Sequence, residues 1–224
     1  MSTYVRLQEE ERIEDDMSFM RRFVKPGMRI LDIGANHGVY GLTFARLLED
    51  AGHVWAIEPA SQPGAMIEAG IRLNGLQDRI SLLPVALSDH EGEAELNLGG
   101  SSELNTLQST NGSNRTETIQ LRTLDGLLDV LGTEPIDFIK LDAEGEEVNV
   151  LKGGHRFFQQ HDPVILFELK HGSHVNFKLL GAFEILGMSC YYLVPGLQAL
   201  VPVDDPQKVD GYTLNLYAMK PSKA

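Results

Sequence analysis

Apolar runs with the length of β-strands alternate along this chain with segments that have the length of helices. Continuous apolar runs are typical of strands buried on both faces of a sheet, and their alternation with helices indicates parallel strands joined by crossover helices. The pattern therefore predicts an α/β protein with a seven-stranded, mostly parallel sheet and helices on both faces. The predicted strands cover residues 28–35, 53–59, 80–88, 136–145, 163–169, 188–195 and 212–220.

Helical spacing of apolar residues predicts helices at about 39–49 and 63–74, and a further helix at about 11–24 precedes the first strand. One segment, 99–118, is rich in Ser, Thr, Asn and Gly and breaks the alternation, which predicts a long loop inside a β-type insertion. Loops of this length are functional lids or disordered segments, and the sequence leaves both open. The length favours a single domain over residues 1–224.

Charge and composition narrow the classes of partner. The formal net charge of −13 would repel a phosphate backbone, so we expect no nucleic acid partner. The charged N-terminus has no apolar core of a signal peptide, and no stretch approaches the roughly 18 apolar residues of a membrane span. The single cysteine, Cys190, has no possible intramolecular disulfide mate. We therefore expect a cytoplasmic protein.

The stretch "LDIGANHGVYG" (31–41) runs from the first predicted strand through a glycine turn into a helix, an arrangement that brings main-chain N–H groups close to a nucleotide-type ligand. The dinucleotide fingerprint fails when counted from Gly34. Counted from Asn36, it fits at Gly38 and Gly41. Glu58, at the end of the second predicted strand, lies where a Rossmann-type fold places a carboxylate against the ribose hydroxyls.

A second carboxylate, Asp32, comes two residues before Gly34 and could orient the ammonium group of a ligand. Together Asp32 and Glu58 call for a ligand with a ribose diol and a charged amino acid end. S-adenosylmethionine has both.

Four motifs resemble successive signatures of the FkbM-type methyltransferases: "DIGANHGVYG", "AIEP", "VALSDHEG" and "IDFIKLDAEGEEVNVLKGG", with "PVILFEL" following in the same series. The resemblance covers roughly residues 28–170. It implies a Rossmann-like fold of the class I methyltransferase type, with seven strands of which the last is antiparallel. It also implies transfer of a methyl group from S-adenosylmethionine to a small-molecule acceptor, typically a hydroxyl of a sugar or secondary metabolite.

The resemblance also implies which residues hold the cofactor. Gly34, Asn36 and Gly38 would wrap its methionine end, Glu58 would hold its ribose, and Asp32 would support the turn from below. The adenine would lie near the end of the third strand. The implied cofactor-binding residues are Asp32, Gly34, Asn36, Gly38, Glu58, Ala86, beside Val85, and Asp89.

The segment "KLDAEGEE" carries the candidate chemistry. Asp142 and Glu144 stand two residues apart at the carboxyl end of a strand, where open α/β sheets bind ligands. Paired carboxylates beside a buried strand are costly without a ligand, a proton or a metal, and Lys140 could pair with one of them. Asp142 is the first candidate for the acceptor of the hydroxyl proton, with Glu144 beside it. Glu147 is expected only to offset the helix dipole.

The next strand ends in "FELKHGSH", in which Glu168, His171 and His174 follow at three-residue steps and could complete such a site. Oxygen and imidazole ligands would suit Mg²⁺ or Mn²⁺, although this spacing is not a specific metal signature. The candidate catalytic residues are therefore Asp142, Glu144, Glu168 and His171, with a divalent metal left open.

Two alternatives from other classes also stay open. Asn36, Gly38, Gly41 and Glu58 suit a nicotinamide-dependent oxidoreductase, but the first glycine and a recognisable Tyr-x-x-x-Lys pair are missing. A non-catalytic cofactor-binding module would keep the pocket and lack acceptor chemistry.

Overall fold

The structure is a computed structural model that describes residues 15–49, 51–99, 105–107, 115–171, 174–204 and 215–223. The helices are α2 (Asp15–Phe23), α3 (Val39–Leu47), α4 (Ser61–Asn74), α5 (Leu128–Leu131), α6 (Glu147–Lys152), α7 (Phe157–Gln160) and α8 (Phe177–Ile185), with short 3₁₀ turns at Asp125–Leu127, Pro195–Leu197 and Pro221–Lys223. The strands are β1 (Arg29–Ile33), β2 (His53–Ile57), β3 (Ile80–Leu83), β4 (Ala86–Leu87), β5 (Gly92–Asn97), β6 (Thr116–Arg122), β7 (Phe138–Leu141), β8 (Val164–Glu168), β9 (Lys170–His171), β10 (His174–Val175), β11 (Ser189–Val194), β12 (Ala199–Pro202) and β13 (Asn215–Met219).

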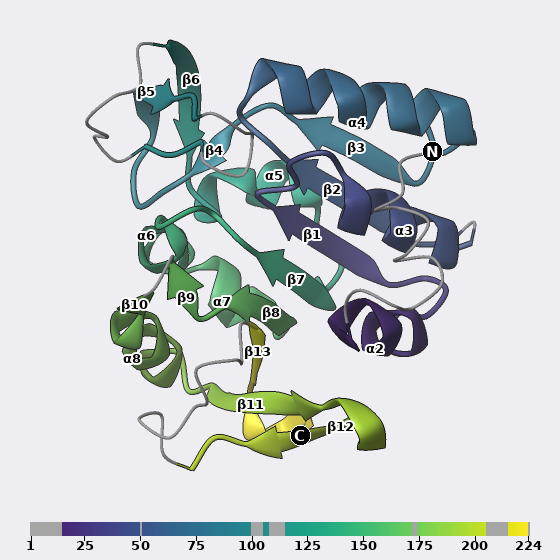
Figure 1. Cartoon of the computed structure of the whole chain (residues 1–224), viewed down its shortest axis with the longest axis vertical. Coiled ribbons are helices and arrows are strands. Elements are labelled where there is room, and N and C mark those ends of the chain that lie inside the picture. Colours follow the sequence, from purple (N-terminus) through teal and green to yellow (C-terminus); the bar gives the residue numbers. More distant parts are fainter. Residues whose placement is uncertain are drawn as a thin grey trace.

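The main sheet has eight strands in the order β12-β11-β13-β8-β7-β1-β2-β3 (Figure 1). Strands β3, β2, β1, β7 and β8 pair in parallel, whereas β13 is antiparallel to both of its neighbours. The predicted α/β class, the mostly parallel sheet and the antiparallel last strand are therefore confirmed. The carboxyl ends of the parallel strands form one edge, where open α/β sheets bind ligands.

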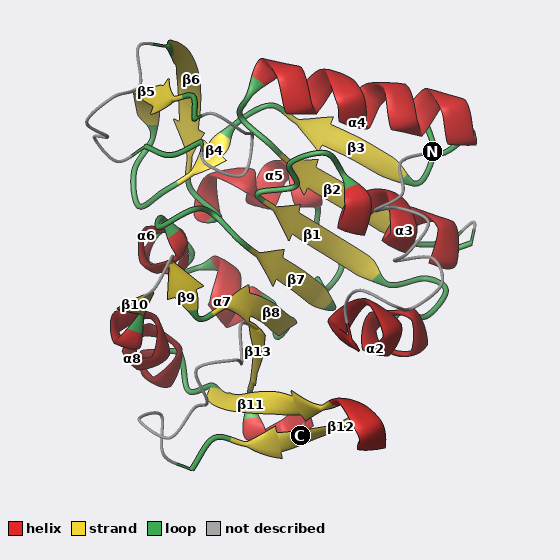
Figure 2. Ribbon diagram, viewed as in Figure 1, coloured by secondary structure: helices red, strands yellow, loops and turns green. Residues whose placement is uncertain are grey.

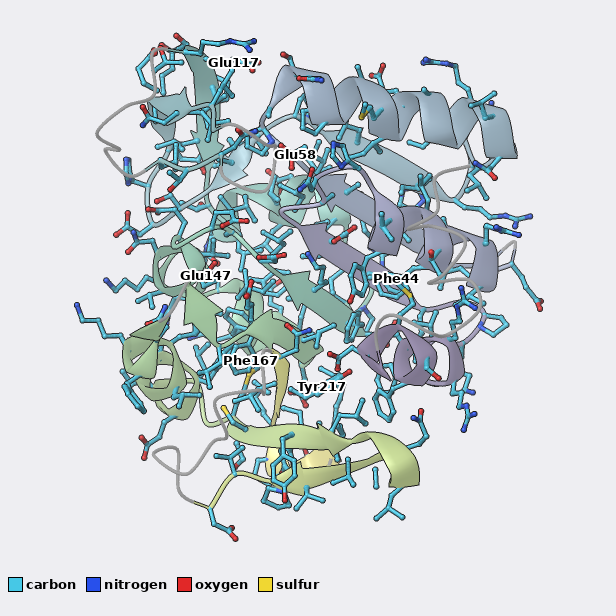
Figure 3. The ribbon with its side chains drawn as sticks, in the orientation of Figure 1. Phe44, Glu58, Glu117, Glu147, Phe167 and Tyr217 are labelled. Carbon is cyan, nitrogen blue, oxygen red and sulfur yellow. The ribbon has the colours of Figure 1, made fainter. Side chains whose placement is uncertain are left out.

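Helices cover both faces of this sheet (Figure 2). On one face, Phe44 of α3 packs with residues of α2 and α4 against alternate strand residues that include Phe138 and Tyr217. On the other face, Phe167 and its neighbours pack against α5, α6, α7 and α8. Figure 3 labels Phe44 and Phe167, which are both fully buried. Burial on both faces explains why the strand sequences are continuously apolar.

The predicted third strand, 80–88, is in fact two strands that belong to different sheets. β3 ends at Leu83, and after Pro84 the chain continues as β4, which pairs in parallel with β6 in a small β4-β6-β5 sheet. Proline has no N–H to donate to the ladder, so the strand cannot continue through it in the main sheet. The expected β-type insertion is therefore a three-stranded arm.

Other boundaries also differ from the expected ones. The main sheet has an eighth strand, β12, which returns antiparallel beside β11 after a turn in which Gln198 has φ +50°. The first helix begins at Asp15 among the described residues, and the predicted loop 99–118 ends where β6 begins at Thr116. Within the described part of the chain, no helix is both long enough and apolar enough to cross a membrane.

Candidate active site

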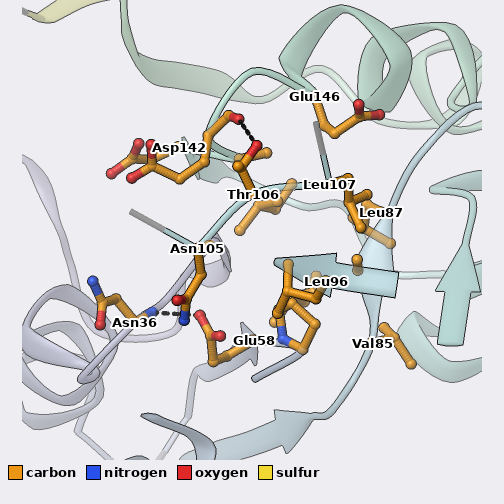
Figure 4. A pocket seen from close by; sticks show the side chains of 17 residues that line it. Asn36, Glu58, Val85, Leu87, Leu96, Asn105, Thr106, Leu107, Asp142 and Glu146 are labelled. Carbon is orange, nitrogen blue, oxygen red and sulfur yellow. Dashed lines mark hydrogen bonds between the residues drawn. The ribbon is translucent and has the colours of Figure 1, made fainter. Parts of the chain in front are cut away.

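A first cavity opens at the carboxyl ends of β1 and β2. Its volume is about 640 Å³, which includes space open to the solvent. Figure 4 shows Asn36, Glu58 and Asn105 together at one end of it, while Val85, Leu87 and Leu96 gather on another side. The cavity thus combines a polar end with an apolar wall. Its lining comprises Ile33, Gly34, Asn36, Ile57, Glu58, Pro59, Val85, Ala86, Leu87, Leu96, Asn105, Thr106, Leu107, Asp142, Ala143, Glu144 and Glu146.

The glycine turn is held very close to the neighbouring strand. The N–H groups of Gly34 and Ala35 both donate to the carbonyl of Ile57 at 3.0 Å. Gly34 has φ +72°, and a Cβ at this position would lie 1.7 Å from the main-chain oxygen of Asp142. A side chain is therefore excluded at Gly34 by both conformation and space. Asn36 also has a positive φ, +48°, which asparagine tolerates better than most residues.

Glu58 ties this turn to the end of β2. Its Oε2 accepts the main-chain N–H of Asn36 at 2.8 Å, and its Oε1 accepts that of Ala60 at 2.9 Å. Burial raises the pKa of Glu58 above its usual value. A carboxylate has about four lone-pair sites, so two remain for the hydroxyls of a ligand. Within the described residues, the buried Oδ1 of Asn36 has no hydrogen-bond partner, and it too can receive a ligand donor.

Asp32 lies below the turn and is fully buried. Its Oδ2 accepts the N–H of Gly41 at 2.8 Å, and burial raises its pKa. It is not part of the lining of either cavity described here. From this position Asp32 can support the turn through Gly41.

A second cavity, of about 550 Å³ including space open to the solvent, lies at the ends of β7 and β8. Nζ of Lys140 bonds Oδ2 of Asp142 at 2.8 Å and lies 5.2 Å from the ring centre of Tyr40. The lining of the second cavity comprises Tyr40, Lys140, Leu141, Asp142, Leu166, Phe167, Glu168 and Asn215. Asp142 therefore lines both cavities.

Two further carboxyls flank Asp142, with Glu144 in the first cavity and Glu168 in the second. Burial, with a smaller contribution from the negative charge of Asp142, raises the pKa of each to about 7. A carboxylate whose pKa lies near neutral pH is well matched to accepting and releasing a proton.

Glu147, the first residue of α6, shapes the loop between β7 and α6. The side chain of Glu147 is buried, and its Oε1 accepts the N–H groups of Ala143 at 2.9 Å and Gly145 at 3.1 Å. These bonds hold Glu144 at φ +48° and Gly145 at φ +100°. Glu147 therefore clamps the loop that carries Asp142 and Glu144, a role beyond offsetting the helix dipole.

The structure gathers most of the predicted site residues. Gly34, Asn36, Glu58 and Ala86 line the first cavity. Gly38 is in neither cavity lining. A Cβ at Gly38 would contact the side chains of Ile67 and Leu42. Asp89 is exposed beside His90, to which it hydrogen-bonds at 2.7 Å, and the side chain of His171 lies outside the described residues, as does that of His174.

Several residues that line the two cavities were not predicted from the sequence. Thr106 comes from the arm, where it pairs with Asn97, and its hydroxyl donates to the carbonyl of Glu144 at 3.2 Å. Tyr40 and Asn215 reach the second cavity from α3 and β13. The polar Asn215 at the start of an apolar strand was a signal that could have been noticed. Nothing local marks Thr106, because its contact depends on how the arm folds back.

Residues 32–187 match the Methyltransferase FkbM domain. The chain belongs to the FkbM methyltransferase family. A curated relative, the 2-O-methyltransferase NoeI of Sinorhizobium fredii (strain NBRC 101917 / NGR234), is 28% identical over 185 residues, which cover 72% of this chain and 74% of NoeI. The crystal structure of Methyltransferase FkbM from Methylobacillus flagellatus KT superposes with a TM-score of 0.56 at 16% identity, covering 96% of this chain.

That crystal structure shows the shared fold, and this chain spans about half of its length, 53%. Family membership makes this FkbM domain a methyltransferase, supports S-adenosylmethionine as the methyl donor and decides against the oxidoreductase alternative. The first cavity fits this donor, because it offers a carboxylate for a diol, a glycine turn without side-chain obstruction and an apolar wall for a flat ring. Among the described residues, no group of His, Cys, Asp and Glu side chains is arranged to hold a metal ion.

We expect the ligand-free FkbM domain to be more stable at about pH 5 than at about pH 8. A carboxyl whose pKa is higher in the folded than in the unfolded state stabilises the fold fully below its unfolded pKa, and this contribution is lost as the pH rises through the folded value. For Glu144 and Glu168 the loss therefore falls between their ordinary value of 4.5 and about 7.

Thermal unfolding across this pH range measures the effect, and a variant that combines Glu144→Gln with Glu168→Gln should have a flatter profile. An equally steep loss of stability in that variant would assign the pH dependence to other groups.

Proposed function

We propose that this FkbM domain transfers the methyl group of S-adenosylmethionine to a hydroxyl oxygen of a sugar or a related hydroxylated metabolite. The donor would occupy the first cavity and the acceptor the second. The observation that carries this assignment is that Asp142 lines both cavities, so that a donor and an acceptor would meet beside it. The name of the relative, a 2-O-methyltransferase, supports a hydroxyl oxygen as the acceptor.

The donor would supply a methyl group on a positively charged sulfur. An aligned hydroxyl oxygen can displace that sulfur from the methyl carbon. The new bond joins the oxygen to the methyl carbon, and the carbon–sulfur bond breaks with its electron pair left on sulfur. The hydroxyl proton must then go to a base. The task of the protein is therefore to align the oxygen and to accept this proton.

Asp142 and Glu168 divide this task in the proposed mechanism. One oxygen of Asp142 is already bonded to the ammonium of Lys140, and the carboxylate has further lone pairs that can accept a hydrogen bond from the acceptor hydroxyl. We assign to Asp142 the alignment of the hydroxyl. Glu168 lines the same cavity, and its pKa of about 7 lets it take the proton at neutral pH and release it to solvent. Glu144, on the donor side of Asp142, is the second candidate base.

The donor half of this proposal is tested by titration calorimetry with S-adenosylmethionine and with NAD. We expect the first to bind and the second not to. Transfer of a labelled methyl group to a panel of hydroxylated acceptors then tests the enzymatic half. Binding without transfer to any acceptor class would favour the non-catalytic alternative.

Glu58→Ala is expected to weaken S-adenosylmethionine binding by about 1.5–3 kcal/mol, the range for hydrogen bonds to a charged group. The variant loses the proposed ribose acceptor and the two bonds that hold Asn36 and Ala60. Calorimetry measures the change.

Glu117→Ala is the matched control for this prediction. Glu117, labelled in Figure 3, also accepts a main-chain N–H, that of Ser61 at 3.1 Å, but it is only partly buried and lies outside the cavity lining. An equal loss of affinity in both variants would mean that the carboxylate of Glu58 does not hold the ribose.

A further inference from the structure

Asn215 brings an amide group to the wall of the second cavity. It is the first residue of the antiparallel strand β13, and its register partner on β8 is Glu168. Both side chains line the cavity. The amide of Asn215 therefore stands beside the carboxyl that we assign as the base.

The orientation of this amide is fixed from the N-terminal helix. Nδ2 of Asn215 donates to Oδ2 of Asp16 in α2 at 2.9 Å, and the hydroxyl of Tyr217 donates to Oδ1 of the same carboxylate at 2.8 Å. A carboxylate can only accept, so the amide atom that faces Asp16 must be the nitrogen. The amide oxygen and the second N–H of Asn215 then remain for other partners.

The charges around the second cavity restrict what it can hold. Asp142 and Glu168 line it, the negative charge of Glu147 contributes to raising the pKa of Glu168, and the charges of Asp142 and Glu168 contribute to raising that of Glu144. Lys140 is the positive group of the lining, and its ammonium is bonded to Asp142. Among the described residues of the lining, a phosphate or carboxylate on the acceptor would therefore meet like charges, with the one lysine already bonded to Asp142.

Hydroxyl groups suit the same wall, because each hydroxyl both donates and accepts. A hydroxyl can donate to a carboxylate or to the amide oxygen of Asn215 and can accept from its remaining N–H. The ring of Tyr40 adds an apolar surface against which the C–H face of a sugar ring can pack.

We propose that Asn215, oriented by Asp16, hydrogen-bonds a hydroxyl of an uncharged, polyhydroxylated acceptor next to the hydroxyl that reacts. Asn215 is then a specificity-determining contact, and Asp16 is a positioning residue that acts through it. This inference rests on the proposed function, which supplies the reaction but does not include the contact of Asn215 with the acceptor or that of Asp16 with Asn215.

The experiment uses the full chain and a panel of neutral methyl glycosides of glucose, galactose, mannose, fucose and rhamnose, together with the uronates and 6-phosphates of glucose, galactose and mannose. Transfer of labelled methyl from S-adenosylmethionine is measured for each. We expect at least one neutral glycoside to accept the label. We expect every charged sugar to have a kcat/KM at least about 10-fold lower than the best neutral glycoside, because its anion would face the carboxylates of the wall.

Variants then test the two residues with the best neutral acceptor. Asn215→Ala is expected to raise KM about 10-fold or more, and Asp16→Ala to raise it by a smaller factor, with the affinity for S-adenosylmethionine unchanged in both. Asp16→Asn should restore a near-normal KM, because its amide oxygen can still accept from Asn215. Tyr217→Phe is the control for the fold, since it removes a hydrogen bond to Asp16 outside the cavity lining and should leave KM within about threefold.

Three results would overturn the inference while leaving the binding of S-adenosylmethionine intact. They are equal use of charged and neutral acceptors, an unchanged KM in Asn215→Ala, and a normal affinity for S-adenosylmethionine without transfer to any neutral glycoside. Failure of the wild-type chain to bind S-adenosylmethionine would instead overturn the proposed function itself.

Discussion

Glu168→Gln is expected to lower kcat by about 10²–10⁴-fold, the usual contribution of general-base assistance. Glutamine keeps the size of the side chain and its place in the second cavity but cannot take up a proton at neutral pH. The loss should therefore appear in kcat, while the affinity for S-adenosylmethionine, measured by calorimetry, stays close to that of the wild-type chain.

The pH profile identifies the base more sharply than the loss of rate does. A base must be deprotonated to act, so the wild-type kcat should rise with pH through about 7, the pKa of Glu168, and then level off. This step should disappear in Glu168→Gln. It should move to lower pH in Asp142→Asn, because the charge of Asp142 helps to raise that pKa while Lys140 opposes it.

Glu144→Gln is the matched control, because Glu144 has the same raised pKa but lines the donor cavity. A pH step that survives in Glu168→Gln and vanishes in Glu144→Gln would transfer the role to Glu144. Loss of wild-type activity in EDTA, with recovery in Mg²⁺ or Mn²⁺, would contradict direct proton transfer to Glu168 and assign the activation of the hydroxyl to a metal.

Gly34→Ala is expected to destabilise the ligand-free protein by about 2–6 kcal/mol and to abolish S-adenosylmethionine binding. The strain of a non-glycine residue at positive φ costs about 1–3 kcal/mol, and overpacking costs about as much again. The added Cβ would lie 1.7 Å from the main-chain oxygen of Asp142, so the ends of β1 and β7 would have to move apart. Urea unfolding measures the first effect, and calorimetry measures the second.

Gly75→Ala separates the strain of the backbone from the crowding. Gly75 ends α4 with φ +64°, and a Cβ there has nothing within 4 Å. The free energy of unfolding of Gly75→Ala should fall only by the cost of backbone strain, about 1 kcal/mol, and this variant should bind the donor normally. A Gly34→Ala variant that is no less stable than Gly75→Ala would show that the contact between Gly34 and Asp142 does not constrain the site.

The sequence predicted the parts of the fold that depend on local patterns. Strands buried on both faces need continuous apolar runs, and the runs around β1, β2, β7 and β8 have few other possible structures. The glycine turn was equally readable, because the chain can pass so close to Asp142 only at a residue without a side chain. The first-cavity residues Gly34, Asn36, Glu58 and Ala86 followed from the same motifs.

The features that were not predicted depend on contacts between distant residues or on small breaks in a pattern. The run 80–88 is mostly apolar, and only Pro84 marks the point at which the chain leaves one sheet for another. The bond between Asp16 and Asn215 joins residues 199 positions apart, and no local rule pairs them. The buried position of Glu147 depends on how its loop folds, because the same residue in a first helical turn is usually solvated.

The separation of the β4-β6-β5 arm from the main sheet has a consequence for protein engineering. Among the described strands, the arm forms its own sheet, and it contributes Leu96, Asn105, Thr106 and Leu107 to the donor cavity. A one-residue slip in a strand of the main sheet would move its side chains to the wrong face, whereas a change in the arm leaves that register untouched. Grafting this arm between relatives would thus exchange one wall of the proposed donor cavity and leave the main sheet unchanged. Such a chimaera could accept donor analogues with enlarged adenine substituents while keeping its acceptor.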